Sequence, residues 1–158
     1  MAVKVLFVCL GNICRSPTAE GVFQHLVNNA SLSKRIHVDS AGTASWHSGR
    51  APDPRTIAAA KKRNIDLSVL RARSVKPDDF YEFDFILAMD QSNLSDLENI
   101  KPADYAGHLG LFLEFGTHKH HRYVPDPYHG EADGFELVLD LIEDAAAGLL
   151  LKIKNQHL

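Results

Sequence analysis

The first thirty residues of the chain combine a buried strand, a tight polar loop and the start of a helix. Residues 3–8 form a continuous apolar and β-branched run, which is typical of a strand buried on both faces. Gly11 and Asn12 end that run. Ser16 and Pro17 then predict a helix start, with the serine as N-cap and the proline in the first turn. A strand that passes directly into a helix in this way is the usual first unit of a parallel α/β sheet.

The same alternation of strands and helices continues to the end of the chain. Further strands are predicted at 37–40, 83–89 and 109–115, and helices at 16–28, 53–62, 91–99 and 135–153. No repeat and no long linker interrupts this order. We therefore expect a three-layer α/β/α single domain over residues 1–158, with a central, mostly parallel four-stranded sheet.

The composition limits the classes of function that remain. A net charge of −3 argues against a general nucleic-acid or membrane-surface binder. No apolar run approaches the roughly 18 residues that a spanning helix needs, so we expect a cytoplasmic protein without a membrane partner. The two cysteines, Cys9 and Cys14, lie in one segment, which favours reactivity over a disulfide-stapled secreted domain. Two small buried apolar residues would be the simpler interpretation.

The loop after the first strand suits the binding of an anion. Gly11 allows a tight backbone, and Asn12 tolerates left-handed geometry, so that successive N–H groups can point inward. The following helix adds its positive N-terminal end, and Arg15 can hold two phosphate oxygens with its planar fork. A cysteine in such a field favours the thiolate form, which makes Cys9 a candidate nucleophile. The predicted phosphate-binding loop contains Leu10, Gly11, Asn12, Ile13, Cys14 and Ser16 between Cys9 and Arg15.

Cleavage of a phosphate ester also needs a proton for the leaving oxygen. Asp126 is the best candidate donor, because Pro125 and Pro127 stiffen the loop around it. An ordinary turn aspartate next to proline would give the same local pattern. Asp90 ends a predicted strand and is expected to be a structural helix cap.

The segment Cys9-Leu10-Gly11-Asn12-Ile13-Cys14-Arg15-Ser16-Pro17 resembles the low-molecular-weight protein tyrosine phosphatases. The resemblance covers essentially the whole chain, since VDSAGT, LAMDQSNL and VPDPYHG also occur where that family has them. It implies a nucleophile at Cys9, a transition-state clamp at Arg15, a thiolate-bound Ser16 hydroxyl, a loop-shaping Asn12 and a general acid at Asp126. It also implies a reaction without metal or other cofactor.

Further roles follow from the same resemblance. Leu10, Ile13, Trp46 and Tyr128 match apolar or aromatic positions at the family's entrance, although a tryptophan also suits partial core packing. Ser40 would support Asn12, or would simply be a hydroxyl at a strand end. Cys14 would form a reversible disulfide with Cys9, or would be a small buried residue. Leu70 and His129 depart from the family, where many members have a histidine and an aromatic residue respectively.

The expected partner is a protein that carries phosphotyrosine, with inhibition by phosphate-like oxyanions and a monomeric or weakly dimeric state. A protein arginine phosphatase is an alternative. The bulky Ile13 argues against it, because the resemblance implies Thr at this position in the arginine-phosphatase branch. Arsenate reduction would need more cysteines than the chain has. A non-catalytic phosphate-binding regulatory module would be expected to lose Cys9 or Asp126. Residues 118–121, with three histidines, are interpreted as solvated loop rather than a metal site.

Overall fold

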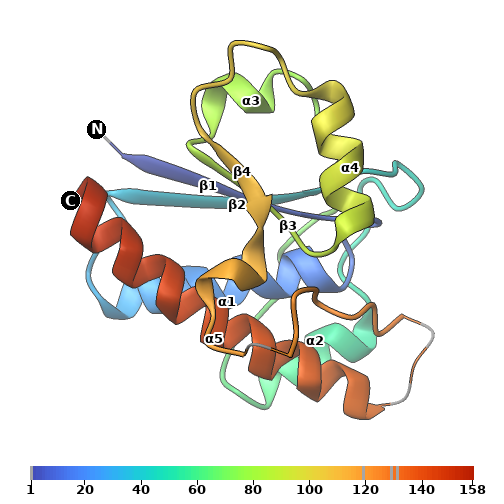
Figure 1. Ribbon diagram of the computed structural model, residues 1–158. Helices are drawn as coiled ribbons and strands as arrows, with labels where there is room; N and C mark the ends of the chain where they lie inside the picture. Colours follow the sequence, from blue (N-terminus) through green and yellow to red (C-terminus); the bar gives the residue numbers. More distant parts are fainter. Residues whose placement is uncertain (1, 119, 129, 131) are drawn as a thin grey trace.

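Four parallel strands form the centre of the molecule (Figure 1). The computed structural model describes residues 2–118, 120–128, 130 and 132–158, the side chains of residues 132 and 133 excepted. The strands are β1 (Val3–Cys9), β2 (Ile36–Gly42), β3 (Phe85–Ala88) and β4 (His108–Leu111), and their order in the sheet is β2-β1-β3-β4. The all-parallel sheet confirms the predicted α/β class.

Helices cover both faces of this sheet (Figure 1). One face carries α1 (Arg15–Asn29), α2 (Pro54–Lys61) and α5 (Ala132–His157), and the other carries α3 (Asp79–Glu82) and α4 (Gln91–Ile100). The side chains of β1 alternate between the two hydrophobic clusters: Phe7 packs on the α1 side, and Leu6 packs with Phe80 and Leu97 on the other. The strand is therefore buried on both faces, as its apolar run predicts.

The predicted strand at 109–115 is wrong in its second half. β4 ends at Leu111, and residues Phe112–Phe115 form a 3₁₀ turn, η1. Phe112 is fully buried there, with its ring centroid 4.8 Å from that of Phe7. An apolar run indicates burial but cannot by itself distinguish a strand from a buried turn, and this explains the error.

The start of α1 also differs from the prediction. The helix begins at Arg15, its cap position is Cys14, and no side chain caps it. Ser16 is not the N-cap, because its hydroxyl lies 3.0 Å from the Cys9 sulfur instead. The helix predicted at 53–62 is present as α2, and its N-cap is Asp53, whose carboxylate accepts a hydrogen bond from the Arg55 N–H.

The carboxyl ends of β1 and β3 lead directly into the loop at 9–15 and into Asp90. Ligands bind at this edge in open parallel sheets, so the fold places the predicted loop where a site is expected. Within the described residues, no helix combines the length and apolar character that crossing a bilayer requires.

Candidate active site

The loop between β1 and α1 directs its carbonyl groups outward. The carbonyls of Cys9 and Leu10 accept hydrogen bonds from residues 43 and 44, and that of Ile13 accepts one from Asp53, all at 2.9 Å. Asn12 has a φ of 57°, the left-handed geometry predicted for it. In the described part of the chain, the backbone N–H groups of residues 11–14 donate to no protein acceptor. Unpaired N–H donors at a helix start are what an anion needs.

Gly11 leaves space for a neighbouring side chain. Its φ lies outside the left-handed region. A Cβ at this position would lie 2.9 Å from Cδ2 of His47. The absence of a side chain therefore makes room for that ring.

Cys9 lies at the bottom of this loop and is 2% exposed. Its sulfur lies 3.0 Å from the Ser16 hydroxyl and accepts a longer hydrogen bond, 3.4 Å, from the Ser16 backbone N–H. Both contacts come from the first turn of α1, where the helix dipole also favours negative charge. The arrangement therefore suits a thiolate nucleophile.

Arg15 is buried beside two carboxylates. Its Nη1 donates to Asp90 Oδ2 at 2.6 Å and to the Val124 carbonyl at 3.1 Å, and its Nη2 lies 3.6 Å from Asp126 Oδ2. Burial by itself would lower the pKa of the guanidinium, but Cys9 and the two carboxylates outweigh this effect and raise that pKa. The side chain is thus a permanent cation held at the cavity floor.

Ten residues surround a cavity of about 160 Å³ above the sulfur. They are Cys9, Leu10, Gly11, Ile13, Cys14, Arg15, Trp46, His47, Asp126 and Tyr128. Trp46 is 72% exposed, so it belongs to the wall and not to the core. Asp126 has a half-exposed carboxylate that opens into this space. The structure therefore brings together every predicted catalytic and wall residue.

A second group of residues holds the loop from behind. The Asn12 Nδ2 donates to the hydroxyls of Ser16 and Ser40, at 2.8 and 3.0 Å, and Asn12 Oδ1 accepts from the backbone N–H of Arg73 at 3.0 Å. The Ser40 hydroxyl in turn donates to Glu20 Oε1 at 2.6 Å. Ser40 thus contacts Asn12, the residue that it is predicted to support.

Cys14 lies next to the site but has a different character from Cys9. Both cysteines are free thiols that form no disulfide. Burial raises the pKa of the Cys14 thiol to about 12, so this group stays protonated at neutral pH.

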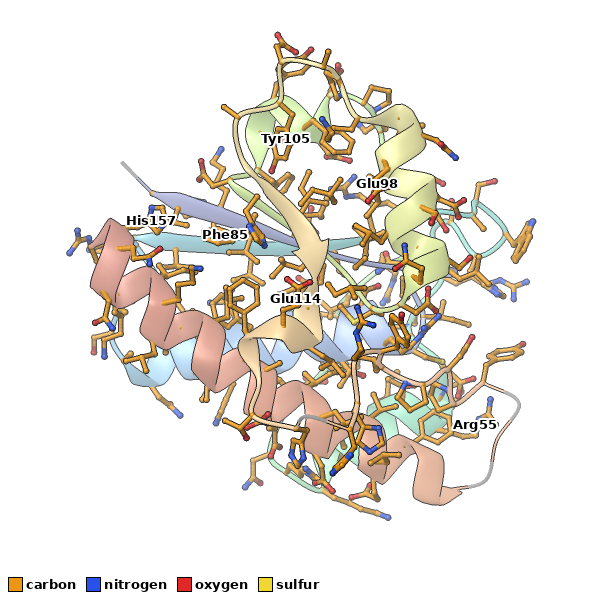
Figure 2. All side chains as sticks on the ribbon, in the orientation of Figure 1. Arg55, Phe85, Glu98, Tyr105, Glu114 and His157 are labelled. Carbon is orange, nitrogen blue, oxygen red and sulfur yellow. The ribbon has the colours of Figure 1, made fainter. Side chains whose placement is uncertain are left out.

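Arg55 holds the segment that carries Asp126. Its guanidinium donates to the Tyr128 carbonyl at 2.7 Å and lies 5.5 Å from the Tyr128 ring centroid and 5.0 Å from that of Phe135. In Figure 2, Arg55 lies far from Phe85 and His157, which pack against each other at the amino ends of the strands. The contact between Arg55 and Tyr128 therefore lies at the same edge of the sheet as the phosphate-binding loop.

Sequence reasoning missed several of these contacts. Asp90 does cap α4, as expected, but its second oxygen also binds Arg15. Glu20, Arg55 and Arg73 gave no signal, because charged residues on helices and loops are ordinarily solvated. A carboxylate at the end of β3 was the one available clue, since neighbouring parallel strands end at the same edge.

Two departures from the family remain to be placed. Leu70 is partly buried and packs against the main hydrophobic cluster. His129 lies outside the described residues. Among the described residues, no three histidine, cysteine or acidic side chains are grouped so that they could hold a metal ion.

Comparison with curated proteins gives a consistent result. The family model for low molecular weight phosphotyrosine protein phosphatase matches residues 4–158. A low molecular weight phosphotyrosine protein phosphatase of Schizosaccharomyces pombe is 47% identical over 84% of this chain and 85% of its own. A putative low molecular weight protein-tyrosine-phosphatase of Synechocystis is 45% identical over 98% of both chains.

Solved structures agree with these relatives. A protein tyrosine phosphatase from Entamoeba histolytica, with Hepes in its active site, superimposes with a TM-score of 0.94 at 39% identity, over 99% of this chain and 100% of the other. A Drosophila arginine phosphatase gives 0.91 at 34%, over 98% and 99%. Vibrio vulnificus Wzb in complex with benzylphosphonate gives 0.81 at 31%, over 96% and 99%. With its loop geometry and this match over nearly its full length, the chain belongs to the low molecular weight phosphotyrosine protein phosphatase family.

Proposed function

We propose that the protein hydrolyses phosphotyrosine through a phosphocysteine on Cys9, with Asp126 as general acid and then general base. The observation that carries this assignment is the Cys9 sulfur with its two Ser16 contacts, on a loop whose residues line the cavity and whose N–H groups at 11–14 donate to no acceptor in the described residues. Family membership makes the chain a phosphatase. The roles of the individual residues are our assignment.

The reaction has two steps. The Cys9 sulfur forms a bond to phosphorus while the bond to the phenolic oxygen breaks, and the Asp126 proton passes to that oxygen. Water then attacks phosphorus, its proton passes to Asp126, and the phosphorus–sulfur bond breaks to release inorganic phosphate. Arg15 and the loop N–H groups stabilise the equatorial oxygens in both steps. No step requires a metal.

The cavity walls favour an aryl phosphate over a shorter ester. Trp46 and Tyr128 stand at the rim, while the sulfur is nearly inaccessible at the floor. A flat ring between the walls spans this depth, whereas a phosphoserine side chain is too short. Ile13 lines the cavity, and its side chain is bulkier than the threonine by which the arginine-phosphatase branch is distinguished, which supports tyrosine over arginine. Arginine phosphatase activity, known for one structural neighbour by its name, is the alternative.

The remaining assignments concern the setting of the enzyme. We infer a phosphotyrosine protein as substrate, and inhibition by phosphate-like oxyanions, since a related structure holds benzylphosphonate. Residues 1–158 are assigned to one domain, in a monomer or weak dimer. The free thiols of Cys9 and Cys14 fit the reducing cytoplasm.

Cys14 is further proposed to protect oxidised Cys9 by forming a disulfide with it. The reaction would be slow, because the Cys14 thiol is protonated at neutral pH.

The decisive experiment measures hydrolysis of p-nitrophenyl phosphate, a phosphotyrosine peptide and a phosphoarginine peptide in the presence of a metal chelator. We expect the wild type to cleave the first two and Cys9→Ser to be inactive. Asp126→Ala should lose about 10²–10⁴-fold on the peptide, and much less on the activated ester, whose leaving group needs no proton. Retained activity in Cys9→Ser would overturn the mechanism, and preferred cleavage of phosphoarginine would establish the alternative.

A further inference from the structure

Glu20 connects the back of the phosphate-binding loop to the protein surface. It lies on α1, one turn after Ser16, and its carboxylate is partly buried. The Ser40 hydroxyl donates to its Oε1 at 2.6 Å. On the other side, Glu20 lines a surface hollow of about 240 Å³, together with Gln24, His25, Asp66 and Leu70. An acidic group in this place has no part in binding the phosphate or the leaving group.

The hydrogen bonds between Glu20 and Cys9 have a defined direction. The Asn12 Nδ2 carries two hydrogens, and it donates to the hydroxyl oxygens of both Ser16 and Ser40. Each hydroxyl oxygen therefore accepts from Asn12 and must direct its own hydrogen elsewhere. The Ser40 hydrogen goes to Glu20. The Ser16 hydrogen has two acceptors within reach, the Cys9 sulfur at 3.0 Å and the Ala41 carbonyl at 3.4 Å, and a thiolate at the shorter distance is the stronger acceptor.

We propose that Glu20 is a positioning residue for the phosphatase reaction, whose ionised carboxylate holds the Ser40 hydroxyl as an acceptor for Asn12 and so keeps Asn12 and the Ser16 hydroxyl in place beside the Cys9 thiolate. The inference rests on the proposed function, because it assigns a role within that same site. A carboxylate is an acceptor only, so it holds the Ser40 hydrogen outward. A neutral carboxyl can donate to Ser40 instead, and the Ser40 oxygen would then lose its fixed relation to Asn12.

The surroundings of Glu20 place this switch in the physiological pH range. Burial raises the pKa of Glu20 to about 7, the Ser40 hydrogen bond opposes this rise, and Asp39 of β2 adds to it. The Arg73 side chain, from the segment before α3, lowers it but is itself paired with Asp39 at 3.0 Å. Asp66 and His25 border the same hollow. Leu70, which lines the same hollow, offers Glu20 no cationic partner.

The test compares Glu20→Gln and Glu20→Ala with the wild type. Glutamine keeps an acceptor for Ser40 but cannot ionise, whereas alanine removes both properties. Asp66→Asn is the matched control, because it removes a carboxylate from the same hollow without touching the hydrogen-bonded chain. Two quantities are measured from pH 5 to 9: the rate of Cys9 alkylation by iodoacetamide, and kcat and KM for p-nitrophenyl phosphate. Cys9→Ser supplies the background from Cys14.

We expect the wild-type alkylation rate and kcat to rise through a step near pH 7, in addition to the ionisation of the nucleophile. Glu20→Gln should lack this step and keep most of the activity at pH 8. Glu20→Ala should lose about fivefold to tenfold in kcat, roughly the net worth of one ordinary hydrogen bond, with little change in KM. Asp66→Asn should follow the wild type throughout.

Two results would overturn the proposal. One is a pH profile of Glu20→Gln that keeps the step near pH 7, since another group would then be titrating. The other is equal loss in Glu20→Gln and Glu20→Ala, which would make the residue merely structural. Alkylation does not require turnover, so it judges Glu20 even if hydrolysis by Cys9→Ser has already disproved the proposed mechanism.

Discussion

Arg15 contacts two carboxylates, and the two contacts have different consequences. Asp90 binds it at 2.6 Å and is only partly exposed, whereas Asp126 lies 3.6 Å away and is half exposed. The shorter contact fixes one edge of the guanidinium. The longer one leaves the Asp126 carboxyl group less tightly held, so that it can approach the leaving oxygen, which is consistent with its proposed role.

Asp90→Asn separates the charge of Asp90 from its capping role. The amide oxygen can still accept from the Asn93 N–H, so the cap of α4 should persist. Arg15 loses its charged partner, and we expect kcat/KM for p-nitrophenyl phosphate to fall about tenfold or more. Asp90→Ala should lose the cap as well, at a cost of about 1 kcal/mol in the free energy of unfolding. Equal stability of the two variants, measured by urea unfolding, would contradict this separation.

Individual site residues were predictable where chemistry depends on neighbours in sequence. Cys9, Asn12 and Arg15 belong to one loop, and the spacing between them is already the geometry of the site. Glu20 and Arg73 could not be identified in this way. Their roles depend on which side of α1 faces β2 and on how the segment at 73–75 pairs with the end of β2, and both are decided by tertiary packing.

At the scale of elements, α2 serves as an anchor for the segment of Asp126. Arg55 contributes a hydrogen bond to the Tyr128 carbonyl and is oriented by Asp53, which binds it through both oxygens. Arg55→Ala should therefore loosen the general acid, and we expect a greater loss of kcat on phenyl phosphate than on p-nitrophenyl phosphate. Arg50→Ala, at another exposed arginine, is the control. Equal losses on the two esters would show that the acid is not affected.

The contact between α5 and η1 requires glycine at one position. A Cβ on Gly148 would lie 1.8 Å from the Phe115 carbonyl oxygen, whereas a Cβ on Gly134 of the same helix meets only Pro127 at ordinary contact distance. Gly148→Ala should destabilise the fold by about 2 kcal/mol or more, since helix and turn must separate. Gly134→Ala should instead stabilise it by up to about 1 kcal/mol through helix propensity. Thermal unfolding of both variants tests the contrast, and a neutral Gly148→Ala would contradict the close packing.

The short elements η1 and α3 were not predicted from the sequence, whereas the longer ones were. The long apolar stripe of α5 and the buried runs of β1 and β3 have a clear period or length. The turn η1 is as apolar as a strand, and α3 has only four residues, too few for any period. Short elements of this kind are fixed by contacts with distant parts of the chain, as Phe112 is by Phe7.

At the scale of the whole molecule, the buried position of Glu20 has a cost in stability. Its pKa is about 7 in the folded protein, above the ordinary value of 4.5. Between these two values the folded state binds more protons than the unfolded state, so the free energy of unfolding decreases as the pH rises from about 4.5 to 7. Above pH 7 the folded protein bears the full cost of an ionised, partly buried carboxylate.

Glu20→Gln should remove that cost. We expect it to raise the free energy of unfolding at pH 8 by on the order of 1–3 kcal/mol relative to wild type, and to change it little at pH 4. Asp66→Asn should instead lower the free energy of unfolding at pH 8. A hydrogen bond from Ser68 lowers the pKa of Asp66, so the ionised Asp66 stabilises the folded state at a pH above the pKa that this group has in the unfolded state. Urea unfolding at the two pH values measures both.

The stability of Glu20→Gln and the pH dependence of its Cys9 reactivity together show whether Glu20 serves the active site or only the packing of the fold. If Glu20 served only the fold, replacing it should lower or leave unchanged the stability at pH 8. A gain in stability together with the loss of the pH-dependent step in Cys9 reactivity means that the carboxylate is kept at the expense of stability, as strained or desolvated groups at active sites commonly are. Reduced stability of Glu20→Gln at pH 8 would instead place Glu20 among the residues that hold α1 against β2.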